Sequence, residues 1–240
     1  FVALDCRIKS GNDIRAKESE MKREGSQGLM AFWVDIDAAN TSAFQEWHNC
    51  EHIPERISIP GFNVGRRYRG IDDAPNFLMF YETDTAAIFA SAPYMARLND
   101  PTPWTQESLT YFKNPSRNIY SLEIEYGHVA PMEAPYIDTL RFNFDGPVRE
   151  IKQWLEAIEA VEEVDRARLY KVNEEISSIM TSERQIYGGG PGQQKYLAMI
   201  EGALPSAAQD GLAPPAGAID IFSDSFWLEI ALYPDVQPEA

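Results

Sequence analysis

The stretch from residue 47 to residue 68 joins a helix to a strand, and it reads Trp47-His48-Asn49-Cys50-Glu51-His52-Ile53-Pro54-Glu55-Arg56, then Ile59-Pro60-Gly61-Phe62, then Gly65-Arg66-Arg67-Tyr68. Pro54 limits the predicted helix, and Pro60-Gly61 predicts a turn. The alternation that follows is typical of a strand. A helix end, a turn and a strand start are thus crowded with titratable side chains.

Apolar/polar alternation predicts further strands on both sides of this stretch. In the first half the predicted strands are 28–37, 62–69, 77–82 and 118–126, with helices at 42–50 and 86–98. This β-α-β-β-α-β order is that of a ferredoxin-like unit. An irregular stretch containing Trp104 precedes the last strand.

The second half repeats the order, with strands at 136–144, 164–172, 195–201 and 226–233 and a helix at 147–161. Gly65-Arg66-Arg67-Tyr68 has an echo in Ala167-Arg168-Leu169-Tyr170, which predicts an internal duplication. We therefore expect an α+β fold, in which two ferredoxin-like βαββαβ units in one chain pack sheet to sheet as an intramolecular α+β barrel. A cavity is expected between the sheets.

This interpretation divides the chain into four segments. They are a polar N-terminal extension (1–27), a unit that carries the candidate site (28–126), a linker (127–135) and a second, degenerate unit (136–235). Residues 173–194 are interpreted as a flexible insertion, because their glycine run lacks the lysine and the spacing of a phosphate loop.

Composition limits the function classes. The 240 residues carry a net charge of −16, which disfavours nucleic acid and anionic membranes as partners. The two cysteines, Cys6 and Cys50, make no disulfide framework, and no apolar run is long enough to span a membrane. We expect a cytoplasmic protein, and pairing into a homodimer stays open.

The predicted strands of the first unit have two unlike faces. Met30, Phe32 and Val34 are expected to face the helices. The opposite face is expected to carry a mixture of residues: Trp33, Asp35, Arg67, Met79, Tyr81, Ser121 and Glu123. Such a mixture suits a ligand cavity, and it also suits a solvated sheet face.

Two histidines four residues apart, His48 and His52, match the His-x-x-Glu-His pattern of inverted zinc peptidases. The short helix and the lack of a convincing third ligand argue against it, so we expect no metal and no cofactor. If a metal bound, His48 and His52 would be its ligands. His52 better suits general acid/base catalysis, with Glu51 orienting its ring. A helix-terminal histidine with a purely structural role would look the same.

Other side chains are candidates for substrate binding. Arg67 could anchor a carboxylate or enolate oxygen, or pair with one of the many acids of the chain. Asp35 could be a base or a turn former, and Tyr81 could donate to an oxyanion or only pack. The full substrate-binding set is Trp33, Asp35, Met79, Tyr81 and Trp104.

Residues 28–123 resemble the dimeric α+β barrel superfamily, particularly EthD-like and related ferredoxin-like proteins. The resemblance rests on Trp47-x-x-x-Glu51-His52-Ile53-Pro54-Glu55-Arg56, Ile59-Pro60-Gly61-Phe62, Arg66-Arg67-Tyr68 and Asn99-Asp100-Pro101-Thr102-Pro103-Trp104. It implies a site in the barrel interior with His52 at its rim. The superfamily includes cofactor-free monooxygenases, isomerases, cyclases, decarboxylases and haem-dependent dismutases, so the fold alone does not identify the reaction.

The second half departs from the motif. Leu155, Ile158 and Glu159 stand where the first half has His48, Glu51 and His52, so we expect one site, and the proximal histidine that haem would need is missing.

We expect a small-molecule enzyme of organic-acid or aromatic-compound catabolism. It would perform cofactor-independent proton transfer, of isomerase or lyase type, in the barrel cavity. His52, Glu51 and Arg67 would be catalytic, and the substrate a small organic acid, lactone or aromatic compound. The alternatives are a cofactor-free monooxygenase and a non-catalytic EthD-like ligand-binding or accessory protein.

Overall fold

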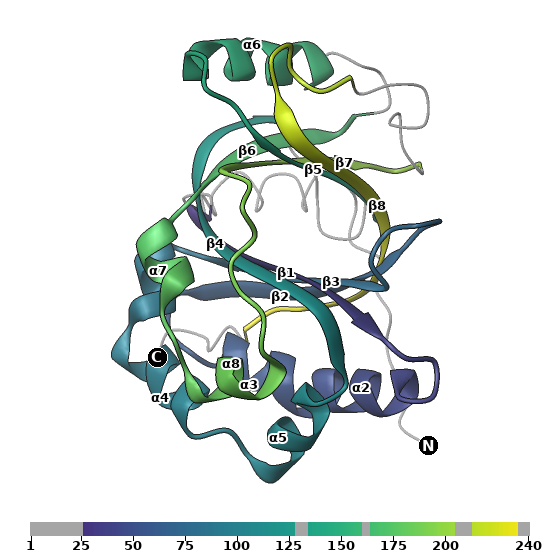
Figure 1. Cartoon of the computed structure of the whole chain (residues 1–240), viewed down its shortest axis with the longest axis vertical. Helices are drawn as coiled ribbons and strands as arrows, with labels where there is room; N and C mark the ends of the chain where they lie inside the picture. The colour runs from purple at the N-terminus through teal and green to yellow at the C-terminus, as the bar shows by residue number, and fades with distance from the viewer. Residues whose placement is uncertain (1–25, 128–133, 160–163, 205–212, 235–240) are drawn as a thin grey trace, which may run out of the picture.

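One closed antiparallel barrel organises the structure, a computed structural model that describes residues 26–127, 134–159, 164–204 and 213–234. The strands of these residues are hydrogen-bonded in the order β1-β3-β2-β8-β5-β7-β6-β4 (Figure 1). Their bounds are β1 Gly28–Ile36, β2 Phe62–Gly70, β3 Phe77–Thr83, β4 Phe112–Gly127, β5 Tyr136–Asn143, β6 Arg166–Val172, β7 Tyr196–Gly202 and β8 Ile219–Leu232. The predicted α+β barrel is confirmed as a closed barrel within one chain, and its composition from two ferredoxin-like units stays a prediction.

Helices cover the outside of the barrel. They are α2 Thr41–Trp47, the π-helical turn η1 His48–His52, α3 Ile53–Ile57, the 3₁₀ turn η2 Ala86–Ala90, α4 Ala92–Asn99, α5 Pro103–Leu109, α6 Val148–Glu159, α7 Glu174–Ser178 and α8 Ser182–Tyr187. Helices α2 to α5 lie along the first-half strands, and α6 lies on the second-half strands (Figure 1). Although α7 and α8 connect β6 to β7, α8 packs on α4, α5 and β4.

Three local predictions were wrong. Pro54 does not end the helix, because it lies in the first turn of α3, where the missing N–H needs no intrahelical partner. The stretch around Trp104 is helical (α5), since Pro103 starts the helix and the Thr102 hydroxyl accepts from the Thr105 N–H. Residues 173–194 are not only a flexible connection, because Asn173 and Thr181 cap α7 and α8 in the same way.

The face assignment of the first unit was also wrong. In the β1–β3 register Met30 lies opposite Tyr81 and Phe32 opposite Met79, and directly opposed residues share a face. Met79 and Tyr81 therefore join the helix-facing core of Met30, Phe32 and Val34. Trp33 lies on the other face of the sheet and points into the barrel. Apolar side chains fill the barrel around it: Leu29, Ala31, Tyr68, Leu78, Phe80, Tyr120, Ile137, Tyr170, Leu197, Met199 and Phe226.

The barrel interior also contains a buried ring of four charges. Arg168 lies 2.8 Å from Glu82 and 2.9 Å from Glu201, and Arg66 lies 3.6 Å and 3.5 Å from the same two carboxylates. Burial would raise the pKa of Glu82, but Arg168 and Arg66 outweigh it and lower this pKa to about 2. Each arginine thus bridges a carboxylate of its own half and one of the other half.

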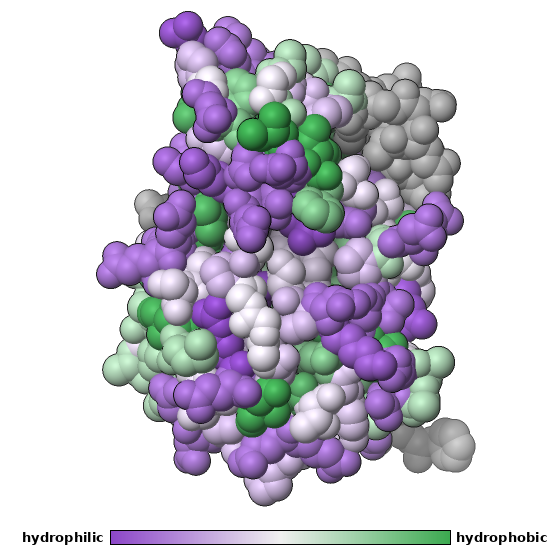
Figure 2. Space-filling view, viewed as in Figure 1, coloured by the Kyte–Doolittle hydropathy of each residue, from purple (hydrophilic) through white to green (hydrophobic). Residues whose placement is uncertain are grey.

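The surface agrees with the composition. Hydrophilic side chains cover most of the face in Figure 2. Within the described ranges no helix is long and apolar enough to cross a membrane. Cys50 is exposed, while Cys6, His128 and nearly all of the predicted extension 1–27 lie outside the described residues.

Candidate functional site

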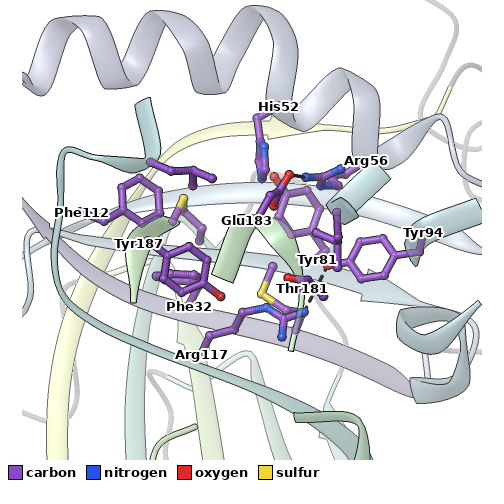
Figure 3. Close-up of a pocket in the computed structure, with 14 residues that line it drawn as sticks. Phe32, His52, Arg56, Tyr81, Tyr94, Phe112, Arg117, Thr181, Glu183 and Tyr187 are labelled. Carbon is purple, nitrogen blue, oxygen red and sulfur yellow. Dashed lines mark hydrogen bonds and ion pairs between the residues drawn. The ribbon is translucent and has the colours of Figure 1, made fainter. Parts of the chain in front are cut away.

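A narrow pocket lies outside the barrel, between the first-half strands and their helices, and not between the sheets as predicted (Figure 3). Its free space is about 30 Å³. Strands, helices and the β6–β7 connection all contribute to its lining: Met30, Phe32, His52, Arg56, Met79, Tyr81, Tyr94, Leu98, Leu109, Phe112, Arg117, Thr181, Glu183 and Tyr187. A space of this size holds water but no organic substrate, so a substrate must displace part of the wall.

The π-turn η1 places the two histidines of the site. The Ile53 N–H donates to the His48 carbonyl, five residues earlier, which widens the helix. The imidazoles of His48 and His52 then stack, with ring centroids 5.5 Å apart and planes inclined by 25°. Turns of this kind are frequent at functional sites, and here the turn brings both rings to the sheet.

His48 links Arg67 to the pocket. One Arg67 N–H lies 3.2 Å from His48 Nδ1, and Arg67 can only donate, so Nδ1 accepts and Nε2 carries the proton. His48 Nε2 lies 3.3 Å from the Tyr81 hydroxyl, which then accepts and has its own proton left for the pocket. Burial, followed by the charges of Arg67 and Arg56, holds the pKa of His48 well below its usual range.

His52 is the buried imidazole of the pocket lining. Its ring packs 4.4 Å from that of Trp47, and its side chain is only 9% exposed. Its Nδ1 is buried without a hydrogen-bond partner among the described residues. Burial, then the charges of Arg56 and His48, holds its pKa well below the usual range, so the imidazole is neutral. A buried nitrogen without a protein partner is costly, so this atom is available to hydrogen-bond a molecule in the pocket.

Charged groups face His52 across the pocket. Arg56 pairs with Glu183 from α8 and, at 2.8 Å, with Glu55, and its guanidinium lies over the Tyr94 ring. Burial opposes the charge of Arg56, but Glu183, Tyr94 and Glu55 outweigh it and raise its pKa. Arg117 donates to the Tyr94 hydroxyl at 3.2 Å. Figure 3 shows His52, Arg56 and Glu183 pointing toward one another.

Only some of the predicted site residues meet here. His52, Met79 and Tyr81 line the pocket, and Arg67 acts on it through His48. Arg67 also donates to Glu229 at 2.7 Å and to Asn49 at 2.8 Å. Its Nε and one terminal nitrogen are thus used within the protein, and Arg67 is not part of the pocket lining.

The other four predicted residues lie elsewhere. Glu51 accepts from Thr102 at 2.6 Å and from Thr105 at 2.8 Å, so its carboxylate holds α5 in place. Trp33 lies in the barrel under Arg141, and Asp35 accepts from the Asn76 N–H and the Asn114 amide at a strand end. Trp104 is 37% exposed on α5. The structure does not bring these residues to the pocket.

Sequence reasoning missed six polar residues of the lining: Arg56, Tyr94, Arg117, Thr181, Glu183 and Tyr187. Arg56 stands inside the Trp47–Arg56 motif, one turn after His52, and this spacing was the available signal. Glu183 and Thr181 had none, because their segment is about 130 residues away in sequence and folds back onto the first half.

Among the described residues no group of three or more His, Cys, Asp or Glu side chains is arranged to hold a metal ion. His48 uses both ring nitrogens within the protein, and His52 faces the guanidinium of Arg56. In the pair that matches the zinc pattern, the two rings are stacked and both nitrogens of His48 are already used.

Comparisons with known proteins give the fold. No protein-family model and no curated protein matches this sequence. A solved structure of an anthrone oxidase-like protein matches 90% of this chain and 97% of its own, with 11% identity and a TM-score of 0.57. A candidate monooxygenase from Fusobacterium nucleatum subsp. nucleatum ATCC 25586 matches 87% of this chain and 95% of its own, with 6% identity and a TM-score of 0.55.

A candidate chlorite dismutase matches 84% of this chain and 94% of its own, with 12% identity and a TM-score of 0.50. These neighbours are proteins of the dimeric α+β barrel family. Similarity at such low identity extends to the fold and no further. This chain has the α+β barrel fold that they share.

Proposed function

We propose that the chain is a small-molecule enzyme that uses His52 as a neutral general base. The observation that carries the proposal is the buried, unpartnered Nδ1 of His52 in a pocket that also contains Arg56 and Arg117. A neutral imidazole accepts a proton, and nearby guanidinium groups stabilise the anion that forms. The substrate class is a small organic acid, lactone or aromatic compound with an acidic C–H or O–H bond.

The pocket supplies what a proton transfer needs. Once His52 takes the proton, the negative charge develops on an enolate or phenolate oxygen, which the Tyr81 hydroxyl and Arg117 can hydrogen-bond. Burial raises the pKa of Tyr81, so it stays protonated and donates. Returning the proton to another carbon gives an isomerase, and expelling a leaving group gives a lyase. A positioned base contributes roughly 10²–10⁴-fold to such a reaction.

A cofactor-free monooxygenase is the second candidate, favoured by the fold shared with an anthrone oxidase-like protein and candidate monooxygenases. It begins with the same deprotonation. The carbanion then reacts with O₂, so that a methylene group and O₂ give a carbonyl group and water. The two candidates differ only in whether the anion meets a proton or O₂.

Haem does not fit the described residues. His48 has both ring nitrogens engaged, and an iron bound by His52 would face the cation Arg56. No step of the proposed reaction uses haem.

Deuterium exchange tests the proposal. The substrate panel is anthrone, single-ring phenolic acids and small unsaturated lactones. Each is incubated in D₂O without oxygen, and wash-in at carbon is followed by NMR with wild type and His52→Gln. Exchange or isomerisation that needs His52 supports a base, and stoichiometric O₂ uptake in air then selects the monooxygenase. Equal exchange in the two proteins would overturn the role of His52, and ligand binding with no catalysed exchange, isomerisation or O₂ uptake in either protein would favour an accessory protein and overturn the proposal.

We also infer that the chain is a tandem duplication of an EthD-like ferredoxin unit, with units at 28–126 and 136–235. The strand orders β4-β1-β3-β2 and β8-β5-β7-β6 support it. The strand registers agree as well. In the β2–β3 pair Arg66 lies opposite Phe80, and in the corresponding β6–β7 pair Arg168, the counterpart of Arg66, lies opposite Met199. The ring of Arg66, Glu82, Arg168 and Glu201 has the two-fold pattern of an isologous dimer interface. A cytoplasmic location remains our expectation.

A further inference from the structure

The β6–β7 connection closes the pocket with a charge. Glu183 is only 5% exposed, and its carboxylate binds the inner side of Arg56, while Glu55 binds Arg56 at 2.8 Å. Burial raises the pKa of Glu183, and Arg56 only partly offsets this rise. Glu183 is therefore a carboxylate held in the pocket at a desolvation cost.

The pocket also contains a guanidinium with little to bind. Arg117 has five N–H donors, and its hydrogen bond within the described residues goes to the neutral hydroxyl of Tyr94. Arg56 is already shared by Glu55 and Glu183, whereas Arg117 donates to a neutral hydroxyl. An anion that replaced Glu183 on Arg56 would therefore find a second cation, Arg117, in the same pocket.

An aromatic wall stands beside these cations. The rings of Phe32 and Tyr187 lie 5.2 Å apart, those of Phe32 and Phe112 5.4 Å, and those of Phe112 and Tyr187 6.0 Å. Edge-to-face packing of this kind accepts a further aromatic ring. Tyr187 belongs to α8, as Glu183 does, so one movement of α8 would free both an anion site and space for a ring.

The attachment of α8 permits such a movement. Arg184 binds the carbonyls of Ser177 and Ile179 within its own segment, and the movement would have to break the hydrogen bonds of the Ser182 N–H and hydroxyl to Asn99 of α4. Gly188 and Gly189 follow with φ of +69° and +76°, and a side chain at Gly188 would meet no atom within 4 Å. Glycine adopts this backbone without strain, but Gly189 packs against Pro115 and Gly190 pairs with Ser116 of β4, so Gly188 is the position at which the end of the helix can turn.

We propose that the pocket binds a single-ring aromatic monoanion, and that its carboxylate or phenolate oxygen replaces Glu183 on Arg56, with Arg117 as the second contact. Glu183 is thus a built-in occupant of the anion site. The exchange of one ion pair for another keeps Arg56 paired, and the departure of α8 enlarges the narrow space. The proposal rests on the proposed function only in taking this pocket as the substrate site.

Binding of benzoate tests the exchange. Benzoate is titrated by calorimetry into wild type, Glu183→Gln and a matched control, Glu175→Gln, which changes an exposed glutamate of α7. Because the amide competes less well for Arg56, Glu183→Gln should bind benzoate roughly tenfold or more tightly, and Glu175→Gln as wild type does. Neutral benzamide should bind about tenfold more weakly than benzoate to wild type. Equal or weaker binding of benzoate by Glu183→Gln would overturn the proposal.

A second measurement needs no variant. Amide hydrogen exchange of residues 182–187 in wild type should become faster when benzoate saturates the protein, because the ligand displaces α8. A ligand that bound without displacement would slow this exchange and overturn the proposal. Both measurements detect binding and need no turnover. If benzoate displaces Glu183 but no His52-dependent proton transfer is found, the proposed function alone is refuted. If proton transfer depends on His52 but benzoate does not displace Glu183, the replacement of Glu183 by the ligand alone is refuted.

Discussion

The outer faces of the two half-barrels have the same strand register and opposite chemistry. In the second half α6 packs Leu155 and Ile158 against the strands, which present Leu169, Ala198 and Ile200. At the matching strand positions the first half presents Arg67, Met79 and Tyr81. The second half makes a dry apolar core, and the first half makes a polar pocket.

This difference shows what a site costs the fold. Among the described residues between α6 and its strands, every buried side-chain nitrogen has a partner. On the polar face of the first half, His52 Nδ1 has none. The polar face also needs support from other elements: Glu229 of β8 holds Arg67, and Glu183 of α8 holds Arg56. The second half thus stabilises the site of the first half.

Removal of His52 should have the largest effect and make the first half as inert as the second. His52→Gln keeps the size of the side chain but removes the base, so turnover should fall by about 10²–10⁴-fold. Steady-state kinetics on the substrate found by deuterium exchange measures this. Cys50→Ser, an exposed change in the same π-turn, should leave turnover intact. Equal turnover of His52→Gln and wild type would contradict the assignment.

The buried ring offers a matched comparison of stability. Arg168→Met leaves Glu82 and Glu201 without their closest partner, which should lower the free energy of unfolding by about 3–5 kcal/mol. Arg66→Met should cost less, about 1–3 kcal/mol, because its contacts of 3.6 Å and 3.5 Å are longer. Urea denaturation measures both. Equal losses would show that the ring is energetically symmetric.

Tyr81 tests the link from Arg67 through His48 to the pocket. Tyr81→Phe removes the hydroxyl that pairs with His48 Nε2, and kcat/KM should fall about tenfold, mostly through kcat. Tyr111→Phe removes a hydroxyl bonded to the exposed Glu107 and serves as the control. An unchanged kcat would remove Tyr81 from the mechanism.

The pH dependence of stability should differ between the halves, since residues 136–235 contain no histidine. His48 and His52 have pKa values well below 6.5 in the folded chain, whereas the unfolded chain binds their protons as pH falls through 6.5. Their stabilising contribution is therefore complete above pH 6.5 and is lost below it, by up to about 1.4 kcal/mol per pH unit for each histidine.

His48→Gln should reduce this slope by the share of one histidine. Urea denaturation of wild type and variant between pH 7.5 and pH 5 measures it. The acid limb of kcat/KM should also lie below pH 6.5, because His52 stays neutral there. An acid limb centred above 6.5 would contradict a buried neutral base.

Local pattern was sufficient for much of the fold. The alternation in Gly28–Ile36 and Phe77–Thr83 predicted both strands, since side chains of a strand point to its two faces in turn. The dense titratable motif around His52 also pointed to the right helix. The residues Met79 and Tyr81 were named as site candidates, although for the wrong face.

Tertiary structure decided the rest. Alternation within each strand does not say which set of residues shares a face with the next strand, and the register of Met30 with Tyr81 decided this. The sequence by itself determined the strands and the barrel class, and it singled out His52 as a candidate, because these depend on neighbours along the chain. Only the folded chain brought Glu183 to Arg56 and bound Glu51 to α5, because contacts between distant segments depend on how the whole barrel closes.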